Sequence, residues 1–261
     1  MTSALLLSVQ GLTKRFGGVV ALDQVAFTVT PGCIAGLIGP NGAGKSTFFN
    51  VLTGVFPADA GEMHFGERRI NGLSPHTLVG LGLVRTFQKI HPFRGMTVLE
   101  SVMVARHART RAGLFLSLLR LPRVAEEERK IRQDALDAIA FVGLEASCDD
   151  AAETLPLGRQ RLLQLACAIA TEPRMIFLDE PASGLNTSET SQLAKLLLAI
   201  RKQGITIVLV EHDMSLVMKI SDRITVLNFG QVLADGTPDQ IRLNPNVIRA
   251  YLGTEGPHAG G

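Results

Sequence analysis

A glycine-rich loop between an apolar run and a helix-like run is the feature that most constrains this fold. Residues 39–47 read GPNGAGKST and fit the pattern G-x-x-x-x-G-K-[ST]. The preceding CIAGLIG at 33–39 is almost wholly apolar, as in a strand covered on both faces. The following STFFNVLTG at 46–54 predicts a helix that stops at Gly54. This order predicts a phosphate-binding loop rather than a merely flexible glycine turn.

The residue types of this loop suit phosphate groups. A glycine backbone wraps closely with its N–H groups pointing inward, and the following helix presents its positive end. Lys45 would place its charge on the β- and γ-phosphates, and the Ser46 hydroxyl would reach Mg²⁺. The residues expected at the phosphates are therefore Gly39, Pro40, Asn41, Gly42, Ala43, Gly44, Lys45, Ser46 and Thr47.

Polar residues close two further apolar runs. RMIFLDEP at 174–181 puts Asp179 and Glu180 at the end of a predicted buried strand. Asp179 would hold Mg²⁺, directly or through water, and Glu180 would orient the attacking water; capping of the next helix is the alternative reading. His212 ends ITIVLVEH, where a lone histidine is usually a polar strand terminus. In an open parallel sheet, however, this end of the strand faces the ligand.

The rest of the chain predicts an α/β fold with a largely parallel sheet. Strand runs alternate with helices, such as the helix from 186 to 204, where Asn186 and Glu189 suit a capping box. The N-terminal residues 5–30 predict two short strands that turn at 16–18. Hairpins are also expected at 61–70, turning at Gly66, and at 224–236, as a terminal hairpin.

Residues 95–150 differ because they carry helix-period patterns and few strand signals. We predict one domain over 5–253, a helical subdomain inserted at about 95–170, and a disordered tail at 254–261. The apolar, basic stretch 107–123 would either lie near a membrane partner or pack within the subdomain.

Composition excludes several classes of protein. The charge is +2, with 26 basic and 24 acidic residues, so nucleic acid is not expected as a main partner. Three separated cysteines without a CxxC pair argue against a disulfide framework or a zinc site. No run approaches the roughly 18 to 20 apolar residues that span a bilayer, and the N-terminus does not read as a signal peptide. The sequence therefore predicts a soluble or peripheral protein.

Together these motifs resemble the ATP-binding cassette (ABC) ATPases, over residues 5 to about 253. The resemblance implies the P-loop NTPase fold of that family, with a mixed, mostly parallel core sheet and an antiparallel β subdomain. It implies ATP and Mg²⁺ as ligands, Glu180 and His212 as catalytic residues, and Gln88 as the glutamine that senses the γ-phosphate. Ser46, Gln88 and Asp179 would serve Mg²⁺. Phe16 occupies the position that stacks on adenine, although it could instead be an ordinary core residue.

The family's signature motif, usually LSGGQ-like, falls on ETLPLGRQRLLQLACAIA at 153–170. In the family this motif closes over the ATP of a partner ATPase. Leu155, Gly158 and Gln160 remain, whereas Pro156 stands at the serine position and Arg159 at the usual glutamine. Pro156 would keep the helix start but remove a hydroxyl and an N–H. We therefore expect an asymmetric dimer, in which the site completed by this signature turns ATP over poorly; the alternative is that Pro156 is merely tolerated.

A narrower resemblance links the chain to the LivG-type ATPases of branched-chain amino acid importers. It rests on RTFQKIHPFRGMTVLESVMV, ASGLNTSET, VLVEHDMSLVM and NPNVIRAYLG. It implies an ATPase that drives amino acid uptake from the inner face of the cell membrane. Its partners would be integral-membrane permease subunits, a second ATPase (a LivF-like chain or another copy) and, indirectly, a periplasmic binding protein. Alternative cargoes are urea or amides and lipopolysaccharide, and the rival class is a soluble ABC ATPase without a transport role.

Overall fold

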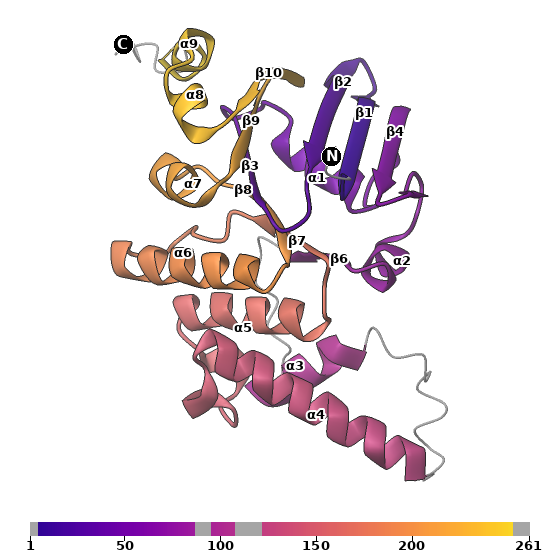
Figure 1. Cartoon of the computed structure of the whole chain (residues 1–261), viewed down its shortest axis with the longest axis vertical. Helices are drawn as coiled ribbons and strands as arrows, with labels where there is room; N and C mark the ends of the chain where they lie inside the picture. Colours follow the sequence, from indigo (N-terminus) through magenta and orange to yellow (C-terminus); the bar gives the residue numbers. More distant parts are fainter. Residues whose placement is uncertain (1–4, 87–94, 108–121, 253–261) are drawn as a thin grey trace.

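The computed structural model describes residues 5–86, 95–107 and 122–252, and a six-stranded sheet lies at its centre (Figure 1). The strand order is β10-β9-β3-β8-β7-β6, parallel from β9 to β6, with β10 antiparallel at one edge. The predicted mostly parallel sheet is thus confirmed. Its strands are β3 (Ile34–Ile38), β6 (Leu83–Thr86), β7 (Met175–Asp179), β8 (Thr206–Val210), β9 (Arg223–Asn228) and β10 (Gln231–Gly236).

A second, four-stranded antiparallel sheet has the order β2-β1-β4-β5 and stands at the upper right of Figure 1. Both predicted N-terminal hairpins are confirmed, although β1 and β2, at 10 and 11 residues, are longer than the short strands expected. The strands are β1 (Leu7–Phe16), β2 (Val19–Val29), β4 (Ala60–Phe65) and β5 (Arg68–Arg69).

Helices of the central part follow the strands closely. The predicted capping box is present at α6, where Asn186 accepts from the Glu189 N–H and the Glu189 side chain accepts from the Asn186 N–H. The 224–236 hairpin forms but is not terminal, because two helices follow it. The helices are α1 (Lys45–Leu52), α2 (Pro75–Gly80), α6 (Thr187–Lys202), α7 (Met214–Ile220), α8 (Pro238–Arg242) and α9 (Pro245–Leu252).

A group of helices lies below the central sheet in Figure 1. It comprises α3 (Val98–His107), α4 (Pro122–Val142), α5 (Leu157–Ala170) and the 3₁₀ turns η1 (Glu145–Ser147) and η2 (Ala152–Thr154). Arg106 joins α3 to α4 through an ion pair with Asp134, at 3.0 Å. The helical character expected here is observed, whereas treating this region as an inserted subdomain remains a prediction, and residues 108–121 lie outside the described part.

Strands β3, β7 and β8 are mostly apolar because both faces of the central sheet are covered. Strands β3, β7 and β8 are buried throughout. Since successive side chains point to opposite faces, each strand contributes side chains to two hydrophobic cores, one on each face of the sheet. One face of β7 and β8 (Ile176, Leu178, Ile207, Leu209) packs with α5 and α6. The other (Met175, Phe177, Val208, Val210) packs with α1 and the N-terminal sheet.

This topology decides where polar loop residues meet. Strands β3, β8 and β7 are parallel neighbours, and Val210 is level with Leu37 on one side and Asp179 on the other. Their carboxyl ends therefore open at one edge of the sheet. The loop after β3, the Asp179–Glu180 pair and the segment after β8 converge there, although they are far apart in the sequence.

Candidate nucleotide-binding site

A hollow of about 470 Å³ lies at this edge of the sheet. The glycine-rich loop forms its base, and Glu180 and His212 come from the neighbouring strand ends. The β1–β2 hairpin and the β9–β10 turn supply the remaining wall. The lining residues are Val19, Val20, Ala21, Asn41, Gly42, Ala43, Gly44, Lys45, Ser46, Thr47, Glu180, His212, Phe229 and Gly230.

The backbone path of the loop requires glycine at two positions. Gly39 and Gly44 have φ values of 154° and 100°. A Cβ at Gly39 would lie 2.2 Å from the carbonyl oxygen of Leu227, and one at Gly44 would lie 2.6 Å from that of Ala21. Gly44 also caps α1 without a side-chain hydrogen bond. The first N–H groups of the helix are therefore left for a ligand, as an anion such as phosphate requires.

Lys45 is held inside the loop. Its Nζ donates to the carbonyl oxygens of Gly39 and Pro40, at 2.6 and 3.0 Å. Burial lowers the pKa of this ammonium group, and the charge of Glu180 acts in the opposite direction. A phosphate oxygen at the same place would compensate the buried charge better than the two carbonyl groups, so the loop is suited to an anionic ligand.

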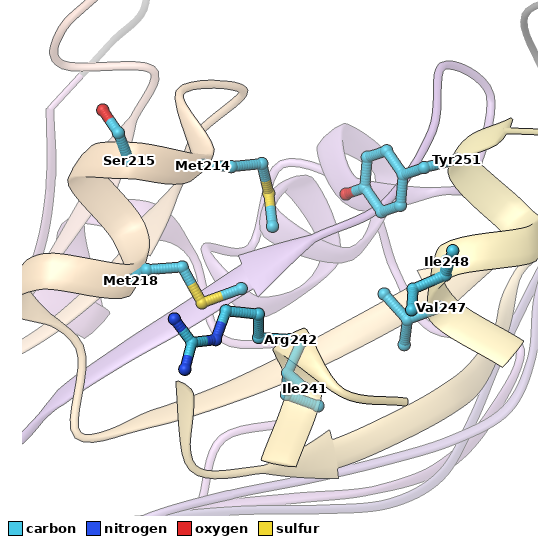
Figure 2. A pocket seen from close by; sticks show the side chains of 8 residues that line it. All are labelled: Met214, Ser215, Met218, Ile241, Arg242, Val247, Ile248 and Tyr251. Atoms are coloured by element: carbon cyan, nitrogen blue, oxygen red, sulfur yellow. The ribbon is translucent and has the colours of Figure 1, made fainter. Parts of the chain in front are cut away.

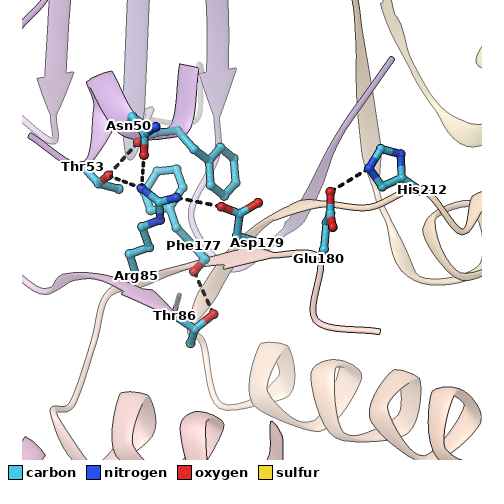
Figure 3. A network of polar contacts seen from close by, with 9 residues as sticks. Asn50, Thr53, Arg85, Thr86, Phe177, Asp179, Glu180 and His212 are labelled. Atoms are coloured by element: carbon cyan, nitrogen blue, oxygen red, sulfur yellow. Dashed lines mark hydrogen bonds and ion pairs between the residues drawn. The ribbon is translucent and has the colours of Figure 1, made fainter. Parts of the chain in front are cut away.

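Glu180 and His212 form a close pair. Glu180 Oε1 lies 2.6 Å from His212 Nε2 (Figure 3). Glu180 has a φ of 49°, which is uncommon for a residue other than glycine and is found at functional sites. A carboxylate next to an imidazole can accept and pass on a proton, which suits the activation of a water molecule.

Asp179 lies deeper than Glu180 and is engaged by an arginine. Arg85 of β6 donates from Nη2 to Asp179 Oδ2 at 2.7 Å (Figure 3). In the described ranges no three His, Cys, Asp or Glu side chains are grouped as a metal site. Oxygen donors such as Ser46 and Asp179 nevertheless fit Mg²⁺, which keeps several of its waters and takes few protein ligands. Gln88, the third expected ligand, lies outside the described residues.

Glu211 was not selected from the sequence. It is only 4% exposed, and its two oxygens accept from the N–H groups of Ala182 and His212, at 2.6 and 3.1 Å. Burial raises the pKa of this carboxyl group. The sequence feature that could have identified Glu211 is its place directly after a predicted buried strand and before His212. Glu211 thus ties the segment after Glu180 to the one that carries His212.

Phe16 does not line the hollow. Phe16 is 43% exposed, and its ring meets the Phe56 ring edge-on, with the centroids 5.4 Å apart. The aromatic ring among the lining residues belongs to Phe229, which is 86% exposed and has a φ of 46°. The next residue, Gly230, donates to the Ala43 carbonyl oxygen at 3.0 Å, so this turn is fixed against the loop.

The predicted signature residues lie at the start of α5, and none of them lines the hollow. Pro156 is the N-cap residue, with φ −56° and ψ 153°, and makes no side-chain capping bond. Gln160 donates to the Leu155 carbonyl oxygen at 2.7 Å, and Arg159 donates to the Ser147 hydroxyl at 2.8 Å. A Cβ on Gly158 would lie 2.6 Å from Glu189 Oε1, so a larger residue here would require the Glu189 side chain to move.

The last described helix reaches the phosphate-binding loop. Burial raises the pKa of Tyr251 to about 12, and a hydrogen bond from the backbone N–H of Gly39 acts against this shift. Figure 2 shows the Tyr251 ring across an apolar groove from Met214 and Met218 of α7. No local sequence pattern connects this tyrosine with the loop.

Two family profiles match the chain. One, described as ABC transporter, matches residues 22–183, which is more than half of the chain. The other, described as branched-chain amino acid ATP-binding cassette transporter, matches residues 231–257 and so includes Tyr251. Within the described ranges, no helix combines the length and apolar character needed to cross a membrane.

Whole-chain relatives agree with these profiles. The high-affinity branched-chain amino acid transport ATP-binding protein LivG of Escherichia coli K12 is 46% identical over 253 residues, which cover 95% of this chain and 98% of LivG. The corresponding BraF of Pseudomonas aeruginosa is 43% identical, with the same coverage. A crystal structure titled as the ADP conformation of an ATP-binding cassette of an ABC transporter superposes with a TM-score of 0.83, at 32% identity over 95% of this chain and 99% of that one. The chain therefore belongs to the ABC transporter family, as one of its ATP-binding cassette ATPases.

Proposed function

We propose that this chain is the ATP-hydrolysing subunit of an ABC importer for branched-chain amino acids. The observation that carries the proposal is the Glu180–His212 pair, 2.6 Å apart, beside the phosphate-binding loop in a chain that matches LivG along almost its whole length. The match of residues 231–257 to the branched-chain amino acid profile supports the cargo.

In the proposed reaction the loop binds the phosphates of ATP. Lys45 exchanges the carbonyl oxygens of Gly39 and Pro40 for phosphate oxygens. Glu180 orients and polarises the attacking water, and His212 holds Glu180 and faces the γ-phosphate. Mg²⁺, when bound at Ser46, Asp179 and Gln88, supplies positive charge to the β- and γ-phosphates. The remaining residues of the loop, from Gly39 to Thr47, hold the nucleotide. Because Phe16 does not line the hollow, the base would have to extend beyond the hollow to stack on the Phe16 ring.

The proposed assembly places a second ATPase against this site. The partner's ATP would be covered by the signature residues of this chain, Leu155, Pro156, Gly158 and Gln160. The partner, a LivF-like chain or another copy, would in turn cover the ATP bound at the phosphate-binding loop of this chain. Because ATP is enclosed only in the closed dimer, its binding drives closure. Integral-membrane permease subunits on the inner face of the membrane would convert this closure into transport, and a periplasmic binding protein would deliver the amino acid. Nucleic acid has no role in this scheme.

The test is to purify the tagged chain from its native membranes and reconstitute what co-purifies into proteoliposomes. We expect two permease subunits and a second ATPase, with uptake of leucine, isoleucine or valine that requires ATP inside the vesicles. Uptake of urea or amides, or release of lipopolysaccharide, would keep the ATPase and change the cargo. Recovery without any membrane protein would contradict the transport role and favour a soluble ABC ATPase.

A further inference from the structure

Arg85 connects three parts of the site, and nothing in the proposed reaction uses it. From β6 its guanidinium group reaches Asp179 at the end of β7 through Nη2, at 2.7 Å. Its Nη1 donates to Asn50 Oδ1 at 2.6 Å and to Thr53 Oγ1 at 3.1 Å. Asn50 belongs to α1, which begins at Lys45, and Thr53 caps that helix. Figure 3 shows this fork between the helix and the strand.

We infer that Arg85 is a positioning residue that fixes Asp179 for the bound metal ion and holds it in register with the phosphate-binding helix. The inference rests on the proposed role of Asp179 toward Mg²⁺. Residues that orient a metal ligand from behind matter nearly as much as the ligand itself, because they determine where its oxygen points.

The ion pair between Arg85 and Asp179 is buried, so each charge depends on the other for a partner. The side chains of Arg85 and Asp179 are 12% and 6% exposed. A charge so placed has to be paired, and losing one partner leaves the other unpaired in a poorly hydrated place. The contact uses Oδ2 of Asp179, so the second carboxylate oxygen lies outside this ion pair.

Only an arginine fits this position. The planar guanidinium group donates from Nη1 to α1 and its cap and from Nη2 to β7 at the same time, whereas a lysine ammonium is a single point on a flexible stem. The guanidinium carbon also lies 5.9 Å from the centroid of the Phe49 ring in α1. A lysine at position 85 would keep the charge and lose the fixed geometry.

The arrangement also connects the metal ligand to β6. This strand ends at Thr86, two residues before Gln88 in the sequence. Because Arg85 is the side chain of β6 that holds Asp179, a displacement of β6 would displace the carboxylate. The metal site is thereby tied to the strand that leads to the predicted γ-phosphate sensor.

The test measures the metal directly, with Mn²⁺ as a paramagnetic probe and the full-length chain saturated with ADP. We expect Arg85→Lys to weaken Mn²⁺ binding about tenfold to hundredfold, as is typical when the residue behind a metal ligand is changed. The binding of ADP without divalent ions should stay within about twofold, because Arg85 lines no part of the hollow. Equal Mn²⁺ affinity in Arg85→Lys and the unaltered chain would overturn the inference.

Two further variants separate positioning from stability. Arg106→Lys is the matched control, since Arg106 is another buried arginine, ion-paired with Asp134, in the helical group away from the hollow. Arg106→Lys should leave Mn²⁺ binding unchanged, even if it lowers the unfolding temperature as much as Arg85→Lys does. Thr53→Val removes one anchor of the fork and keeps the ion pair, so it should weaken Mn²⁺ binding in the same direction by a smaller factor. If Arg85→Lys does not fold, an unchanged affinity in Thr53→Val overturns the inference.

Asp179→Asn separates the proposed metal role of Asp179 from the positioning role of Arg85. If Asp179→Asn keeps Mn²⁺ affinity, the proposed metal role of Asp179 is wrong, and the inference about Arg85 is lost with it. If Asp179→Asn loses affinity while Arg85→Lys keeps it, only the positioning role of Arg85 is wrong.

Discussion

The backbone N–H of Gly39 donates a hydrogen bond to the hydroxyl group of Tyr251. The carbonyl oxygen of the same glycine accepts from Lys45 at 2.6 Å. One residue of the phosphate-binding loop thus holds both the lysine expected at the phosphates and the last described helix. Tyr251 lies within the segment that matches the branched-chain amino acid profile. This branch-specific end of the chain is therefore in contact with the general nucleotide site.

Tyr251→Phe should weaken ATP binding and lower the unfolding temperature. The change keeps the ring in its groove and removes only the acceptor, so a largely buried N–H of Gly39 loses its partner, at a cost of about 1–3 kcal/mol. Nucleotide titration and thermal unfolding of the purified chain measure both effects. Met218→Leu is the control, because Met218 lines the same groove. If Tyr251→Phe and Met218→Leu bind ATP alike, the hydrogen bond does not matter for the loop.

Glu180→Gln should abolish most hydrolysis and leave ATP binding intact. The amide cannot accept the proton of the attacking water, and general acid–base catalysis is typically worth on the order of 10² to 10⁴ in rate. Phosphate release and nucleotide titration on the same preparation separate the two effects. Glu62→Gln, in β4 of the other sheet, serves as the control. A Glu180→Gln chain that releases phosphate at the original rate would show that another group activates water.

Phe16→Ala should weaken ATP binding roughly tenfold or more, because aromatic stacking on a base is worth about 1–3 kcal/mol. ATP and inorganic triphosphate should be titrated in parallel, since triphosphate has no base and its affinity should not change. Phe229→Ala is the comparison, because Phe229 lines the hollow while Phe16 packs on Phe56. If only Phe229→Ala loses the preference for ATP over triphosphate, the base stacks on Phe229 instead.

The sequence predicted those parts of the site that local pattern controls. The continuous apolar runs of β3, β7 and β8 indicate strands that contribute to a hydrophobic core on each face of the sheet. The glycine spacing determines the loop, and Asn186 with Glu189 forms a local helix cap. The polar contacts behind the site depend on which strands are neighbours. Arg85 meets Asp179 across 94 residues only because β6 lies next to β7. Strand order is a property of the whole chain, so no local pattern could have predicted that contact.

Pro156→Ser should raise ATP turnover in the reconstituted complex if the altered signature limits one of its two sites. A serine at this N-cap could accept from the first turn of α5 and present a hydroxyl group to the partner's ATP. Pro156→Ala is the matched control, since it restores the N–H without the hydroxyl group. Turnover that is the same in the serine variant and the unaltered complex would mean that Pro156 is merely tolerated.

Glu211→Gln should change how stability depends on pH. Burial raises the pKa of this carboxyl group in the folded chain above its ordinary value of 4.5. A group of this kind favours the folded state below the unfolded pKa, and this contribution is lost as the pH rises through the folded pKa. The glutamine cannot ionise, so the unfolding temperature of the variant relative to the unaltered chain should rise with pH above about 4.5. Thermal unfolding between about pH 4 and 8 measures this, with Glu62→Gln as the exposed-strand control.

Parallel curves for Glu211→Gln and the unaltered chain would mean that Glu211 does not titrate differently on folding. The hydrogen bonds from Ala182 and His212 would then fully offset the cost of its burial.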